Sequence, residues 1–172
     1  MSENEIESDA PQVHTLSVYV ANKPGVLARI AQIFSRRGYN IDSLVVSPST
    51  DGRYSRMTIA AQGSEDGLEQ IILQVGKLVD VLHCSDHALE EAVVRELAMI
   101  KILADAEHRS EALHICEHFG GKTVDLTPTS MIVMVTGDSA KVDACINMFD
   151  QFTVIELVRT GKVVMARGNE ET

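Results

Sequence analysis

The sequence predicts an α+β fold made of two ferredoxin-like βαββαβ units in tandem. Two observations predict it. Each half of the chain runs through strand-period and helix-period stretches in the same order, which is the order of the split βαβ fold. In that fold an antiparallel four-stranded sheet carries both helices on one face. The second helices of the two halves also share an apolar stripe, Leu68, Ile71, Ile72 and Val75 recurring as Val142, Cys145, Ile146 and Phe149.

The first half opens with a strand in which Leu16, Val18 and Val20 alternate with more polar residues. A Pro-Gly turn at 22–25 breaks the alternation, and an amphipathic helix follows that Gly38 is placed to end. We then expect strands at 41–47 and around 57–61, a second helix after Ser64 as its N-cap, and a fourth strand at 79–85. The stripe of the first helix is Leu27, Ile30, Ala31 and Phe34.

The second half repeats this order, with strands expected at 97–103, 123–127, 131–136 and 153–158. Asp138 is placed to cap its second helix, and an extra hairpin strand is expected at 162–167 after a Thr-Gly turn. We assign residues 1–12 to a disordered acidic tail, 13–88 to the first domain and 94–168 to the second. The stripe of the first helix in this half is Ala112, Ile115, Cys116 and Phe119.

Composition excludes several classes of function. The 172 residues carry a formal net charge of −10, with 15 basic and 25 acidic residues, which argues against nucleic acid or an anionic membrane as partner. No stretch reaches the ~20 apolar residues of a membrane span, and the acidic start is unlike a signal peptide. Three cysteines without framework spacing suit reduced thiols, so we expect a cytoplasmic protein.

Catalytic and metal-binding patterns are weak. His114 and His118 stand i, i+4 on one helix, a spacing that can chelate a metal, but no third ligand is evident and a solvated helix face is the favoured interpretation. The group His83, Cys84 and His87 is interpreted in the same way. Nucleophile-elbow, zinc-protease, dinucleotide and P-loop motifs are absent from the sequence. We therefore expect no catalytic residue, metal site or cofactor in this chain.

The loop at 22–25 carries the strongest indication of a ligand. Pro24-Gly25 suits a type II turn, and a helix that starts just after it offers unpaired N–H groups to a carboxylate. Asn22 can offer its amide oxygen to an ammonium group and its NH₂ to a carboxylate. Alone, such a loop is more often a plain connector. The matching loop of the second half, residues 104–109, has neither Pro nor Gly, so any ligand belongs to the first half.

Longer motifs point to a family. The stretches NKPGVLARI (22–30) and FSRRGYNI (34–41) resemble the opening of an ACT domain, and in particular the small regulatory subunit of acetohydroxyacid synthase, also called acetolactate synthase. The resemblance covers about residues 14–167, and the second half narrows it to this subunit. Further matching stretches are SRMTI (55–59), KLVDV (77–81), REL (95–97), IK (100–101) and VDLTP (124–128).

The resemblance implies a non-catalytic regulatory role in branched-chain amino-acid biosynthesis. A large subunit would carry thiamine diphosphate, magnesium and FAD, and the small subunit would raise its activity and confer feedback inhibition by valine, leucine or isoleucine. Two ACT domains would pair as a homodimer with the effector at their interface. The matching positions are Asn22 and Gly25 on one chain and Asn40 on its partner, completed by the loop around Val26 and Leu27 and by Ile41.

Two alternatives compete with this interpretation. One is a stand-alone amino-acid-responsive ACT protein that acts on another enzyme or on a transcription apparatus. The other is a metal-responsive regulator, prompted by His114 and His118. The family-like second half argues against the first, and the acidic N-terminus offers no basic segment for a regulator that reads DNA.

Overall fold

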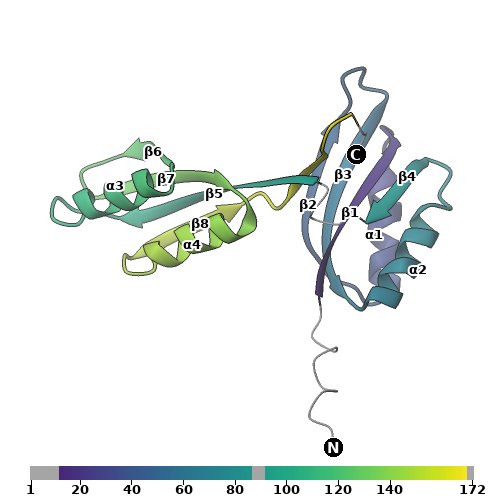
Figure 1. Cartoon of the computed structure of the whole chain (residues 1–172), viewed down its shortest axis with the longest axis horizontal. Coiled ribbons are helices and arrows are strands. Elements are labelled where there is room, and N and C mark those ends of the chain that lie inside the picture. The colour runs from purple at the N-terminus through teal and green to yellow at the C-terminus, as the bar shows by residue number, and fades with distance from the viewer. Residues whose placement is uncertain (1–11, 87–91, 170–172) are drawn as a thin grey trace, which may run out of the picture. The chain divides into compact units, whose positions relative to one another are not determined.

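The computed structural model describes residues 12–86 and 92–169, and its contacts divide the chain into two compact units. We call the unit that ends at Ala92 unit 1 and the unit Val93–Met165 unit 2; Ala166 and the described residues after it are grouped with unit 1 (Figure 1). The predicted tail, except for Gln12, lies outside the described residues, and so does His87.

Unit 1 has the predicted βαββαβ order and the strand order of a ferredoxin-like sheet. Its sheet runs β2-β3-β1-β4 with all neighbours antiparallel, and the two helices lie on one face of it (Figure 1). The elements are β1 (Gln12–Ala21), α1 (Val26–Arg36), β2 (Ile41–Pro48), β3 (Tyr54–Gly63), α2 (Glu65–Val75) and β4 (Val81–Asp86).

The core of unit 1 follows from the predicted periodicities. Leu16, Val18 and Val20 of β1 are fully buried, and Ile30 and Phe34 of α1 pack into the same cluster. Each such side chain contributes ~1.5–3 kcal/mol by leaving water. The buried side chains of β1 and α1 therefore pack against one another in one core. This packing holds α1, and the loop before it, against the sheet.

Unit 2 repeats the topology, with strand order β6-β7-β5-β8. Its additional strand, β9, pairs with β5 and not with β8, so the hairpin expected from the sequence is wrong although the strand itself is present. β5 starts at residue 92 instead of the expected 97, and this extra length lets it pair with β9 as well as with β8. The elements are β5 (Ala92–Leu103), α3 (Arg109–His118), β6 (Lys122–Leu126), β7 (Ser130–Gly137), α4 (Ser139–Phe149), β8 (Val154–Arg159) and β9 (Val163–Ala166).

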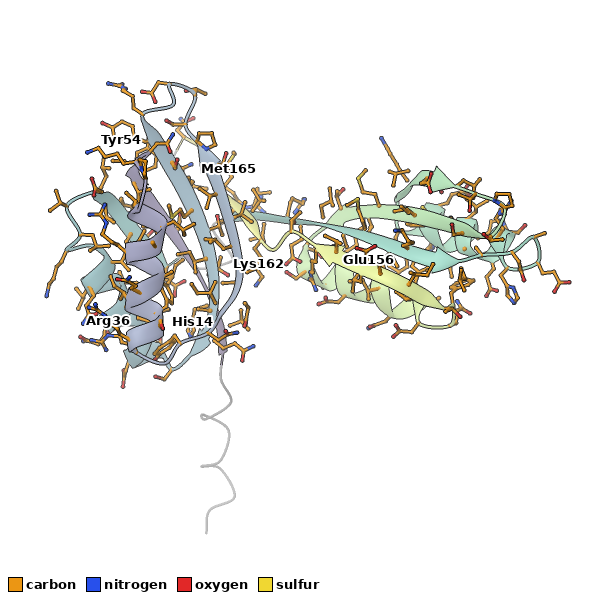
Figure 2. The ribbon with its side chains drawn as sticks, turned by 180° about the vertical axis from the view of Figure 1, so that it is seen from behind. His14, Arg36, Tyr54, Glu156, Lys162 and Met165 are labelled. Atoms are coloured by element: carbon orange, nitrogen blue, oxygen red, sulfur yellow. The ribbon has the colours of Figure 1, made fainter. Side chains whose placement is uncertain are left out.

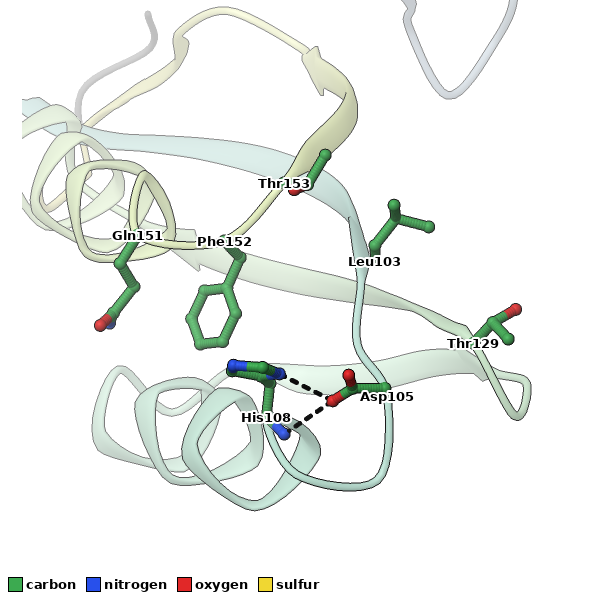
Figure 3. Close-up of a pocket in the computed structure, with 7 residues that line it drawn as sticks. All are labelled: Leu103, Asp105, His108, Thr129, Gln151, Phe152 and Thr153. Atoms are coloured by element: carbon green, nitrogen blue, oxygen red, sulfur yellow. Dashed lines mark hydrogen bonds and ion pairs between the residues drawn. The ribbon is translucent and has the colours of Figure 1, made fainter.

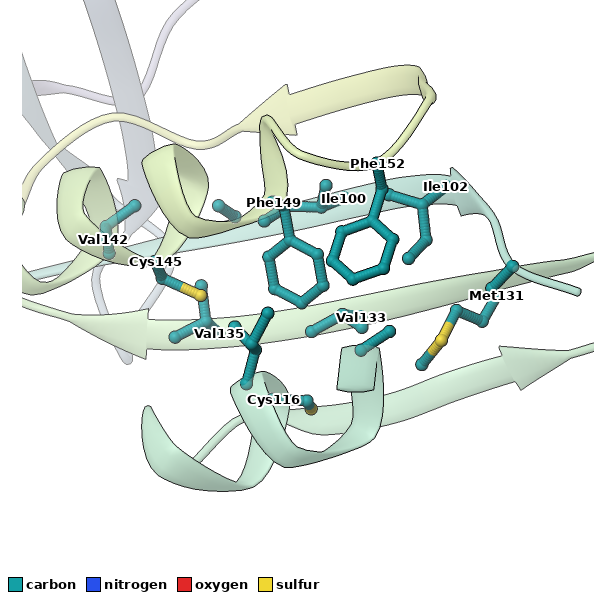
Figure 4. Close-up of a cluster of buried hydrophobic side chains, with 14 residues drawn as sticks. Ile100, Ile102, Cys116, Met131, Val133, Val135, Val142, Cys145, Phe149 and Phe152 are labelled. Carbon is teal, nitrogen blue, oxygen red and sulfur yellow. The ribbon is translucent and has the colours of Figure 1, made fainter. Parts of the chain in front are cut away.

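The core of unit 2 contains both stripe cysteines. Phe149 and Phe152 lie with ring centroids 5.8 Å apart (Figure 4), and Cys116 and Cys145 are buried near them. Burial raises the pKa of the Cys145 thiol to about 11. These thiols therefore act as small apolar side chains and stay protonated at neutral pH.

A buried carboxylate also ties unit 2 together. Glu96 of β5 is only 4% exposed and accepts hydrogen bonds from Ser139 Oγ at 2.5 Å and from Arg159 Nε. Arg159 also contacts Asp143 of α4 at 2.7 Å. The network joins β5, α4 and β8, and it supplies the partners that a buried carboxylate requires.

Candidate effector site

The loop between β1 and α1 forms the type II turn that its Pro-Gly pair predicts. Gly25 has φ 84° and ψ −9°, values that fit the third residue of such a turn and that side-chain-bearing residues rarely adopt. The Val26 amide closes the turn by donating to the Lys23 carbonyl oxygen at 3.5 Å. A Cβ added to Gly25 would meet no atom within 4 Å, so this side of the loop is open.

Backbone and side-chain hydrogen bonds hold the loop in place. The Ala21 amide donates to the Asp80 carbonyl oxygen at 2.8 Å, and the Asn22 amide donates to that of Arg53 at 2.9 Å. The side-chain nitrogen of Asn22 donates to the Gly52 carbonyl oxygen at 3.0 Å. Among the described residues nothing donates to its side-chain oxygen, which therefore remains available as an acceptor for a ligand.

An ion pair network that is centred on Asp80, the residue just before β4, holds the same loop. Asp80 contacts Lys23 at 3.3 Å and Arg29 at 2.6 Å, so it links the turn to the first turns of α1. Partial burial acts to raise the pKa of Asp80, but the Lys23 hydrogen bond and the Arg29 charge outweigh it and hold the pKa below its usual value. The carboxylate is therefore charged at neutral pH and keeps two cations at the loop.

The start of α1 has no side-chain acceptor, in contrast to α2 and α4. Ser64 and Asp138 cap α2 and α4 as predicted, and Asp105 accepts N–H groups before α3. For α1 the N-cap is Gly25, with no capping side chain and no acidic residue in the first turn. The Val26 amide closes the turn, so the next N–H groups of α1 and the positive end of its dipole are left for an external anion.

The second set of predicted residues lies beyond the other end of α1. Gly38, with φ 74°, ends the helix as expected. Asn40 and Ile41 follow it and border a shallow hollow at the end of α1. The side-chain nitrogen of Asn40 donates to Asp42 Oδ1 at 3.1 Å, and among the described residues its side-chain oxygen receives no hydrogen bond.

One chain does not bring the two sets of residues together. The 11 residues of α1 span ~16 Å at 1.5 Å per residue and separate Gly25 from the Asn40 segment. Tyr54 pairs with Ala21, the residue before Asn22, and Figure 2 shows Tyr54 and Arg36 at opposite ends of unit 1. A ligand the size of an amino acid cannot touch both ends of α1 in one chain.

The predicted apolar positions differ in what they offer. The side chain of Val26 is 2% exposed and belongs to the core, so only its backbone faces the loop. Leu27 is 38% exposed at the start of α1. Ile41 is half-buried beside the hollow at the other end. Leu27 and Ile41 therefore supply apolar surface to the two halves of the candidate site.

The equivalent position of unit 2 is closed by the chain itself. Asp105 and His108 line a hollow there, with Phe152 beside them (Figure 3). Asp105 Oδ1 accepts the amides of Glu107 and His108, each at 3.1 Å, and contacts the His108 ring at 2.7 Å. This contact raises the pKa of His108 and lowers that of Asp105. Asp105 thus places a carboxylate of the chain itself on the loop amides just before α3, where the loop before α1 has no acidic side chain.

No other group of side chains in the described ranges forms a comparable site. His114, His118 and His83 are exposed, and no cluster of three or more His, Cys, Asp or Glu residues is placed to hold a metal in residues 12–86 and 92–169. None of the described helices is both long and apolar enough to cross a membrane.

Two contributors to the loop were missed from the sequence. Asp80 braces the turn through side chain and backbone, and Gly52 receives the Asn22 side chain. Asp80 lies within the stretch 77–81 that matches the family, but its role depends on the pairing of β1 with β4. Gly52 acts only through its carbonyl oxygen, and no sequence pattern reports that contact.

Comparisons with known proteins agree over nearly the whole chain. A model described as the AHAS small subunit-like ACT domain matches residues 16–83, and one described as the small subunit of acetolactate synthase matches residues 95–168. A probable acetolactate synthase small subunit of Archaeoglobus fulgidus is 44% identical over 92% of this chain and 99% of its own length. The acetolactate synthase small subunit of Mycobacterium bovis is 42% identical, over 92% and 95% of the two chains.

A solved structure shows the same architecture. The crystal structure of the acetolactate synthase small subunit from Thermotoga maritima superposes with a TM-score of 0.83 at 40% sequence identity. The match covers 92% of this chain and 99% of that one. The likeness therefore includes both βαββαβ units.

Proposed function

The chain belongs to the family of acetolactate synthase small subunits, and we propose that it regulates the large subunit by binding a branched-chain amino acid, valine in the first instance, across a two-fold interface of unit 1. The observation that carries the proposal is the position of the two half-sites. Asn22 with Gly25 and Asn40 with Ile41 lie at opposite ends of one helix. Two copies of α1 that run antiparallel across a two-fold axis place unlike ends together, which makes two equal sites.

The chemistry of the two halves suits an α-amino acid. The carboxylate would accept hydrogen bonds from the open N–H groups at the start of α1, including that of Leu27. The ammonium group would donate to the free side-chain oxygens of Asn22 and Asn40. Leu27 and Ile41 would contact the aliphatic side chain, whose burial contributes roughly 2–3 kcal/mol at ~0.8 kcal/mol per carbon.

Specificity within the branched-chain group follows from the same numbers. One methylene more or less in an apolar pocket changes affinity by only ~10–200-fold. We therefore expect valine, leucine and isoleucine to compete for the site, and amino acids with charged side chains to bind less well because Leu27 and Ile41 offer the side chain apolar surface.

A site built from two chains explains how binding becomes regulation. The effector favours the dimer arrangement in which both halves are close, and so it shifts the population toward that arrangement. The coupling between effector and large subunit would be ~1–3 kcal/mol, and reciprocal for binding. Catalysis, with its thiamine diphosphate, magnesium and FAD, is assigned to the large subunit, and this chain is proposed to contribute no catalytic group.

Reconstitution with the large subunit tests the proposal. The purified chain should raise acetolactate formation by the large subunit, and L-valine should lower it in a saturable way. Asn40→Ala should abolish inhibition and leave activation within about twofold, since in this account Asn40 contacts the effector and its neighbour Asp42 but not the large subunit. The proposal is overturned if valine has no effect on the wild-type complex, or if Asn40→Ala removes activation and inhibition in parallel.

A further inference from the structure

Tyr39 occupies a slot that two glycines open beside the proposed effector site. A Cβ on Gly63 would overlap the Tyr39 ring at Cε1, and a Cβ on Gly67 would overlap its hydroxyl oxygen. Real Cβ atoms do not come so close to another atom, so the Tyr39 ring can lie here only because positions 63 and 67 carry no side chain. The two glycines lie at the end of β3 and in the first turn of α2.

Both the backbone and the hydroxyl group of Tyr39 are in hydrogen-bond contact with a helix end. Its backbone N–H donates to the Phe34 carbonyl oxygen at 3.0 Å while that of Gly38 donates to Ser35 at 3.1 Å, which together form a Schellman cap on α1. Its hydroxyl lies 3.3 Å from Ser64 Oγ, the N-cap of α2. Tyr39 therefore connects the end of α1 to the start of α2.

The segment that follows Tyr39 has few other restraints. Ile41 pairs with Ala61 of β3, but the register shifts between Ile41 and Ser43, so the ladder is interrupted at the start of β2. Asn40 is exposed, and its side chain bonds only to Asp42 among the described residues. The position of the Asn40 side chain thus depends on Tyr39, the preceding residue, whose ring lies between Gly63 and Gly67.

We propose that Tyr39 is a positioning residue for effector recognition, and that its seat between Gly63 and Gly67 fixes the half-site formed by Asn40 and Ile41. The inference rests on the proposed function, because it specifies how one half of that site is held. A half-site that is fixed before binding loses less conformational freedom when the ligand arrives, and this raises affinity. Tyr39 itself need not touch the effector.

Gly67→Ala separates positioning from general packing. Position 67 lies within α2, where alanine favours the helix over glycine, and the atoms that must yield are the far end of a side chain, not backbone. The variant should therefore fold with its ring displaced. Gly76→Ala is the matched control, because position 76 ends the same helix with φ −62° and no Tyr39 atom is near it.

Two measurements on the full chain decide the inference. Without ligand, hydrogen exchange of the Tyr39 amide, which donates to Phe34, and of the Ile41 amide should be at least ~10-fold faster in Gly67→Ala than in wild type or Gly76→Ala. In titration with L-valine, Gly67→Ala should bind at least ~10-fold more weakly, with an unfolding temperature no lower than that of the control. Tyr39→Phe, which keeps the ring, should stay within about threefold of wild type.

The outcomes distinguish this inference from the proposed function. Unchanged exchange in Gly67→Ala overturns the positioning role whatever valine does. Faster exchange with unchanged valine affinity also overturns it, because the segment then moves without consequence for the site. If wild type does not bind valine while exchange responds as expected, the proposed function fails, and Tyr39 holds the segment for a reason other than effector recognition.

Discussion

The side chain of Asn22 donates a 3.0 Å hydrogen bond to the carbonyl oxygen of Gly52, so its amide is oriented by the β2–β3 turn before any ligand arrives. The side-chain oxygen of Asn22, which accepts no hydrogen bond from the described residues, is then held in a fixed orientation in the loop between β1 and α1. Asn22→Ala should weaken L-valine binding by ~10–100-fold, because a hydrogen bond to a charged group contributes about 1.5–3 kcal/mol. Isothermal titration measures this change. Asn147→Ala, at an exposed position of α4, should leave the affinity at the wild-type value, and an equal loss in both variants would refute the role of Asn22.

The carboxylate of Asp80 should stabilise unit 1 only while it is charged. Its folded-state pKa lies below its usual value, so its contribution is present above about pH 4 and is lost as pH falls through the folded pKa. Asp80→Asn should therefore be less stable than wild type at about pH 6, with the difference shrinking toward about pH 3. Thermal unfolding across this range measures it. A difference that grows on acidification would contradict the ion pair network.

Gly25→Ala should destabilise the chain through the backbone alone. The residue has φ 84°, and no atom lies within 4 Å of an added Cβ, so the cost is the ~1–2 kcal/mol of a left-handed conformation. Urea unfolding should show this loss. Gly76→Ala, at φ −62° and with the Ile72 carbonyl oxygen 3.3 Å from the added Cβ, should change stability less than Gly25→Ala, because its backbone conformation suits any residue. If Gly25→Ala left stability unchanged, the type II turn would be wrong.

The Glu96 network should be the most sensitive polar element of unit 2. Arg159→Met leaves a nearly buried carboxylate with Ser139 as its one remaining partner, and we expect a loss of about 2–3 kcal/mol because Arg159 is itself partly exposed. Lys101→Met removes a surface pair with Glu156 and should cost at most ~1 kcal/mol. Urea unfolding compares the two. Equal losses would mean that the buried carboxylate is not held by Arg159.

Local chemistry made much of this structure predictable. The alternation in β1 and the caps Ser64 and Asp138 depend on residues a few positions apart, and they are confirmed. The α1 stripe is confirmed at Ile30 and Phe34, but Val26 is buried in place of Leu27, which is exposed. The positive φ of Gly25 likewise follows from its place after Pro24. Each of these features depends on the residues of a single strand, helix or turn, and so it can be predicted without knowing the rest of the fold.

Features that depend on distant parts of the chain were not predictable. Glu96 is buried because Arg159, 63 residues away, meets it across the sheet. Asp80 braces a loop 57 residues before it. The pairing of β9 with β5 was missed because a short strand after a Thr-Gly turn is more simply a hairpin. In each case the sequence shows the residue type but not the partner.

The most direct test of a site shared by two chains uses heterodimers purified with two affinity tags. A dimer of one Asn22→Ala chain and one Asn40→Ala chain should bind one L-valine with wild-type affinity, since one interface site keeps both asparagines, whereas either variant as a homodimer should show no site of wild-type affinity. A dimer of wild type with the double variant should have no site of wild-type affinity, because each site then lacks one asparagine. The reverse pattern, silence in the first heterodimer and one site in the second, would place the whole site within a single chain and contradict the account.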